Sequence, residues 1–121
     1  PEATPPPGED QTVRVYVVDR AIYVSRDDAT SGEVTLLVQN IGPSAHDVVV
    51  VRWRGDEEAL PVDTQGEVLL DGLIVVARLG PIEGGAEDAV QVEMEDDYAY
   101  VVFSSLPGDY AAGMRAQITT R

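Results

Sequence analysis

The chain has 121 residues, 44% of them apolar, which is enough for one domain with a buried core. Its net charge is −14, with eight arginines and no lysine, so nucleic acid is excluded as a partner because its phosphates would be repelled. There is no cysteine, which excludes disulfides, zinc fingers and thiol catalysis, and no apolar run reaches the roughly 18 residues that a membrane-spanning helix needs.

Residues 1–11 contain four prolines, three acids and no apolar periodicity. This composition predicts a stiff, extended linker or tail, and a single domain over residues 12–121. Such a segment often connects an exported domain to a lipid anchor or membrane helix upstream. An untethered tail has the same composition, so both interpretations stand.

In the first half of the domain, apolar and polar residues alternate with period two, which is typical of half-buried strands. Strands are expected from Thr12 onwards, with Val13, Val15 and Val17 on one face, and then over residues 22–24 and 34–40. Residues 27–32 and 42–44 are expected to be turns. The apolar run 46–51 is predicted to be a central strand buried on both faces.

The second half is less regular. Residues 68–79 fit either a strand or a short helix, and Gly80-Pro81 and Gly84-Gly85 are expected to be turns. Residues 90–94 predict an edge strand with one solvent-exposed face, and residues 98–103 predict a second alternating strand. After a turn at Pro107-Gly108, a last strand is expected over residues 114–120.

Seven or eight short strands, separated by glycine and proline, predict an all-β fold. Their number and spacing are typical of a Greek-key β-sandwich.

The stretch 103–114 is the most informative part of the chain. Ser104, Asp109 and Met114 follow one another with four residues between each pair, around Pro107-Gly108. This spacing resembles the copper loop of the blue copper proteins, the cupredoxins, where the three positions are Cys, His and Met. Residues 38–42, followed by His46, resemble the turn that precedes the first copper ligand of that family. From about residue 12 to residue 121 the chain resembles cupredoxins of the auracyanin, azurin and plastocyanin type.

The resemblance implies four former copper-site positions, of which only His46 and Met114 match the family. A type 1 copper site needs two imidazoles, a thiolate and a long axial thioether. Ser104 cannot replace the thiolate and Asp109 replaces the second histidine, while His46 is the only histidine in the chain. We therefore expect no functional blue copper site and no cofactor. A weaker alternative is a copper or other metal site made by His46, Asp109 and Met114, whose mixed donors would bind with modest affinity.

In the family fold, the positions of His46 and Asp109 meet at one end of the sandwich. We therefore predict that Asp109 forms a hydrogen bond or ion pair with His46, directly or through water. A neighbouring carboxylate favours the charged imidazole, so the pKa of His46 should be raised.

The same end is where redox partners dock in the family, which implies a protein-binding or complex-stabilising domain. The candidate docking residues are Leu106, Pro107, Tyr110 and Ala111. The partner is expected to be a protein, for example one in a membrane-associated redox or surface complex. The resemblance also implies an extracytoplasmic location, periplasmic or at the cell surface, with the membrane reached only through an upstream anchor.

Two other functions compete with this one. The first is an electron-transfer protein with an unconventional copper site at His46, Asp109 and Met114. The second is an immunoglobulin-like surface domain. An enzyme is not expected, because one histidine and scattered serines give no nucleophile-base pair.

Overall fold

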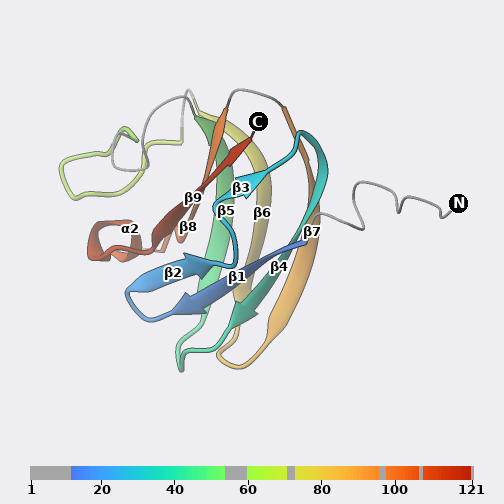
Figure 1. The fold of residues 1–121 in the computed structure, drawn as a ribbon. Coiled ribbons are helices and arrows are strands. Elements are labelled where there is room, and N and C mark those ends of the chain that lie inside the picture. Colours follow the sequence, from blue (N-terminus) through green and yellow to red (C-terminus); the bar gives the residue numbers. More distant parts are fainter. Residues whose placement is uncertain (1–11, 54–59, 71–72, 96–97, 107, 121) are drawn as a thin grey trace, which may run out of the picture.

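The computed structural model describes residues 12–53, 60–70, 73–95, 98–106 and 108–120. These residues form nine strands and one short helix, arranged as two packed sheets with the helix outside them (Figure 1). In chain order the elements are β1 (Thr12–Val18), β2 (Ala21–Val24), β3 (Asp28–Ala29), β4 (Gly32–Asn40), β5 (His46–Trp53), β6 (Ile74–Ile82), β7 (Glu87–Met94), β8 (Ala99–Phe103), α2 (Asp109–Ala112) and β9 (Arg115–Thr120). Within this described part, no helix is long and apolar enough to cross a membrane.

The four-stranded sheet has the order β2-β1-β4-β7, and the five-stranded sheet the order β3-β9-β8-β5-β6. Most neighbouring strands are antiparallel, but β1 pairs with β4, and β3 with β9, in parallel. The prediction of an all-β sandwich is confirmed. The parallel pairs differ from the antiparallel sheets of an immunoglobulin-like domain, so that alternative does not describe this topology.

The main core lies between the two sheets. In β1 the residues Val13, Val15 and Val17 are buried, while their neighbours in the sequence are exposed or half-buried. The strands β4 and β9 show the same alternation. Because successive side chains of a strand point to opposite faces, this alternation puts one mainly apolar face of each strand into the core, as predicted.

A second apolar cluster covers the other face of the five-stranded sheet. It contains Val49, Val51, Val101 and Phe103, together with residues from the segment 60–73 and Tyr110 of α2. β5 is therefore buried on both faces, as predicted. The expectation of an alternating strand over 98–103 is wrong, since all five residues of β8 are buried. The segment that covers its second face is distant in the sequence, so alternation could not indicate it.

Two local expectations also need correction, and one open alternative is decided. The predicted turn 27–32 contains the two-residue strand β3, which is held by β9 from the far end of the chain. Gly80-Pro81 lies inside β6 rather than in a turn, with a cis peptide bond. The ambiguous run 68–79 gives no helix among its described residues, and its second part enters β6. The turn at Gly84-Gly85 is confirmed.

Candidate functional site

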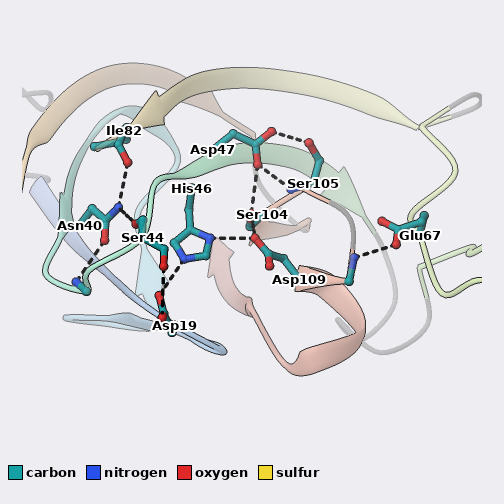
Figure 2. A network of polar contacts seen from close by, with 12 residues as sticks. Asp19, Asn40, Ser44, His46, Asp47, Glu67, Ile82, Ser104, Ser105 and Asp109 are labelled. Carbon is teal, nitrogen blue, oxygen red and sulfur yellow. Dashed lines mark hydrogen bonds and ion pairs between the residues drawn. The ribbon is translucent and has the colours of Figure 1, made fainter. Parts of the chain in front are cut away.

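Three segments meet around His46 at one end of the sandwich (Figure 2). His46 is the first residue of β5. Asp19 comes from the turn between β1 and β2, and Asp109 is the first residue of α2. These three side chains are joined in one chain of polar contacts.

The loop before His46 is fixed by the buried side chain of Asn40. Its Nδ2 donates to the carbonyl oxygens of Ser44, at 2.7 Å, and Ile82, at 2.8 Å, and its Oδ1 accepts from Gly42 N at 3.1 Å. These bonds satisfy backbone groups that a loop would otherwise leave unpaired. A Cβ on Gly84 would lie 2.6 Å from the carbonyl oxygen of Gly42, so the turn 83–85 can approach this loop only with glycine there.

The position of Asp109 is set by the residues around the start of α2. Gly108 has a φ of 82°, a left-handed conformation that favours glycine. Its N–H donates to Oε2 of Glu67 at 2.8 Å, which connects α2 to the segment 60–70. The carbonyl oxygen of Asp109 accepts from Met114 N at 3.0 Å. The side chain of Asp109 is thereby directed at His46 (Figure 2).

Both ring nitrogens of His46 face a carboxylate. Nδ1 lies 2.8 Å from Oδ2 of Asp109, and Nε2 lies 3.1 Å from Oδ1 of Asp19. A neutral imidazole carries one N–H, whereas the imidazolium carries two. Carboxylates only accept, so both hydrogen bonds form together only when His46 is protonated. Below the raised pKa of His46, the site is therefore a buried imidazolium between two carboxylates.

The pKa of His46 follows from two opposing effects. Burial disfavours the charged ring and by itself would lower the pKa. Hydrogen bonds and charge attraction from Asp19 and Asp109 outweigh burial and raise the pKa above its ordinary value of 6.5. The predicted contact between His46 and Asp109, and the direction of the pKa shift, are confirmed. Asp19 was missed as the second partner; its only sequence signal was an acid in the bend after β1.

Ser104 extends the network on the far side of Asp109. It is fully buried, and its Oγ lies 2.6 Å from Oδ2 of Asp109 and 3.1 Å from Oδ1 of Asp47. Asp47 also accepts from the backbone N of Ser105 at 2.7 Å and from the Ser105 hydroxyl. A hydroxyl carries one proton, so Ser104 can donate to only one of these two carboxylates at a time. The roles of Asp47 and Ser105 were also missed, because nothing in their sequence neighbourhood indicates them.

The residues present do not fit a type 1 copper centre. The chain has no thiolate, and both nitrogens of its single imidazole are engaged by carboxylates. Met114 is fully buried in the main apolar core. In the described ranges, no group of three or more His, Cys, Asp or Glu residues is placed to hold a metal ion. Ser104 and Asp109, whose spacing resembles that of two copper ligands, instead form hydrogen bonds with Asp47, His46 and each other.

The docking candidates differ in their exposure. Ala111 is exposed and Leu106 is half-buried, while Pro107 lies outside the described residues. The expectation that Tyr110 offers an apolar edge is wrong, because only 6% of it is exposed. Its ring packs edge-on against Phe103, with centroids 5.6 Å apart. Ile41 was not predicted, yet it is 63% exposed in the loop before His46.

Comparison with known proteins gives similarity at the level of structure alone. No protein-family model matches the chain, and no curated protein matches it. Among solved structures, it is similar to the reduced auracyanin of Roseiflexus castenholzii, with a TM-score of 0.64, 18% identity, and 92% of this chain and 97% of that chain covered.

Two further solved structures agree with this. Auracyanin A, described as a "blue" copper protein of Chloroflexus aurantiacus, has a TM-score of 0.58 and 17% identity, with 91% of this chain and 98% of that chain covered. Reduced rusticyanin has a TM-score of 0.57 and 16% identity, with 92% of this chain and 80% of that chain covered. The resemblance noted in the sequence is thus confirmed for the architecture: this chain has the cupredoxin fold.

Proposed function

We propose that this chain is a copper-free, extracytoplasmic domain of cupredoxin fold that binds a partner protein and stabilises a complex. Its docking surface is the His46 end, which we define as residues 19–20, 41–46, 104–106 and 108–113. The partner is a protein of a membrane-associated redox or surface complex. The location and the partner class rest on the resemblance of the sequence to exported cupredoxins.

One observation carries the proposal: His46 uses both ring nitrogens to hold Asp19 and Asp109. A metal ligand would need one of these nitrogens with its lone pair available. Here the ring instead connects three loops into one unit. A surface that is ordered before it meets its partner loses less conformational freedom on binding.

The exposed groups at the His46 end suit protein contact. Ile41 and Ala111 present exposed apolar side chains. Leu106, five residues before Ala111, is half-buried. The charge of −14 favours a partner with a basic surface, since opposite charges accelerate encounter. Catalysis has less support, because the buried Ser104 hydroxyl contacts carboxylates rather than a histidine base.

A photo-crosslinking amino acid at Ile41 or Ala111, in cells that express the native protein, tests the docking surface. The matched control places it at Glu93, an exposed residue of β7 near the opposite end of the sandwich. We expect one partner to be captured from positions 41 and 111, to be displaced by excess unlabelled domain, and to be missing from position 93. Equal capture from all three positions would contradict the proposed surface.

Copper titration separates this function from electron transfer. We expect the purified domain to stay colourless with Cu(II) and to show no copper-dependent rise in Tm. A blue colour would favour the electron-transfer alternative at His46, Asp109 and Met114. That alternative would require one ring nitrogen of His46 to exchange its carboxylate partner for the metal.

A further inference from the structure

A groove of about 640 Å³ runs along the seam between the two sheets. One wall comes from β2 and the residues after it, including Tyr23, Arg26 and Asp27. The other wall comes from β9, including Arg115 and Gln117. None of the side chains that hold His46 lines the groove, so it is a separate feature of the molecule.

The two arginines of the groove are held in place by their own contacts. The Arg115 guanidinium lies over the ring of Tyr110, with Cζ 4.8 Å from the ring centroid, and its Nη1 donates to the Tyr110 carbonyl oxygen at 2.6 Å. The Nε of Arg26 donates to the carbonyl oxygen of Asp28 at 2.8 Å. Guanidinium groups fixed in this way lose little further freedom when they bind an anion.

Arg26 already meets a carboxylate of its own chain. Its Nη2 lies 3.4 Å from Oδ1 of Asp28, and both side chains are at least one third exposed to solvent. An exposed ion pair of this length contributes little to stability. A ligand carboxylate with better geometry can therefore replace Asp28 at Arg26.

We propose that this groove binds a carboxylate-bearing ligand, with Arg26 and Arg115 contacting the carboxylates from opposite walls. Tyr23, which is 60% exposed, contributes an aromatic surface for the apolar part of the ligand. The ligand chemistry is that of a dicarboxylic acid or a short acidic peptide. Asp27 lines the same groove and opposes an anion there, so it limits the affinity. The inference is independent of the proposed docking function.

The test is an NMR titration of the ¹⁵N-labelled 121-residue domain with succinate and, separately, with an acetylated, amidated triglutamate peptide. We expect saturable shifts confined to residues 22–27 and 115–119. Arg26→Gln should weaken binding about tenfold, the loss expected for one charge-assisted hydrogen bond near solvent. Arg78→Gln, which removes an exposed arginine from β6, is the matched control and should bind like the wild type.

A variant that improves binding makes the test independent of folding defects. Asp27→Asn should tighten binding of both probes several-fold, because it removes the opposing charge. Glu83→Gln removes one negative charge outside the groove and is its control. Stronger binding of the peptide indicates a protein segment as ligand, and stronger binding of succinate a small acid. The absence of saturable shifts with either probe, or equal binding by wild type, Arg26→Gln and Asp27→Asn, would overturn the proposal.

Discussion

Deprotonation of His46 should cost the domain a measurable part of its stability. At low pH the imidazolium donates to Asp109 at 2.8 Å and to Asp19 at 3.1 Å. The neutral ring keeps one N–H, so one of the two bonds is lost and a ring lone pair then faces a carboxylate. The folded-state pKa is raised above 6.5, so the stabilisation is fully present below about pH 6.5 and is lost as pH rises through the folded pKa.

The size of this effect follows from the exposure of the partners. A hydrogen bond to a charged group contributes about 1.5–3 kcal/mol when it is shielded from water. The Asp19 side chain is 48% exposed, against 19% for Asp109, so solvent weakens the Asp19 bond and the neutral ring should keep its proton towards Asp109. We expect a loss of about 1–2 kcal/mol between pH 6 and pH 9.

Urea unfolding of the wild type and His46→Gln, from pH 5.5 to pH 9, measures this loss. The difference in unfolding free energy between the two proteins should shrink as pH rises. Because His46 is the only histidine in the chain, its NMR titration is unambiguous and should give a pKa above 6.5. Parallel stability curves, or a titration below that of an unfolded histidine, would refute the reasoning.

Three further predictions test the network around His46. Asp109→Asn should lower the pKa of His46 more than Asp19→Asn does, because Asp109 is closer and less exposed; NMR titration measures both, and the reverse order would contradict the geometry. The double variant Ser104→Cys, Asp109→His supplies the missing donors and should turn blue with Cu(II), which visible absorption detects; a colourless protein would mean that the loop no longer fits copper. Asn40→Ala removes three side-chain hydrogen bonds, one buried and two part-buried, and should lower the unfolding free energy by about 2–4 kcal/mol. Amide exchange in residues 41–45 should become faster, and unchanged exchange would contradict the positioning role of Asn40.

Much of the sandwich could be predicted from the sequence because strand periodicity is local. In β1, β4 and β9, every second residue is buried, as Val13, Val15 and Val17 are in β1. The alternation of residues in the sequence therefore shows directly which side chains enter the core. The contact between His46 and Asp109 could be anticipated from a spacing pattern that resembles a known family.

Tertiary structure alone decided the features that depend on residues distant in the sequence. β8 is buried on both faces because its second face is covered by Leu60, Val68, Leu70, Leu73 and Tyr110. β3 is a strand only because β9 pairs with it. Asp19 lies 27 residues before His46 and reaches its Nε2 only when the turn after β1 folds against the loop before β5. An acid in a bend and an acid that pairs with a buried histidine look the same in the sequence, because the energy that distinguishes them comes from a neighbour supplied by the fold.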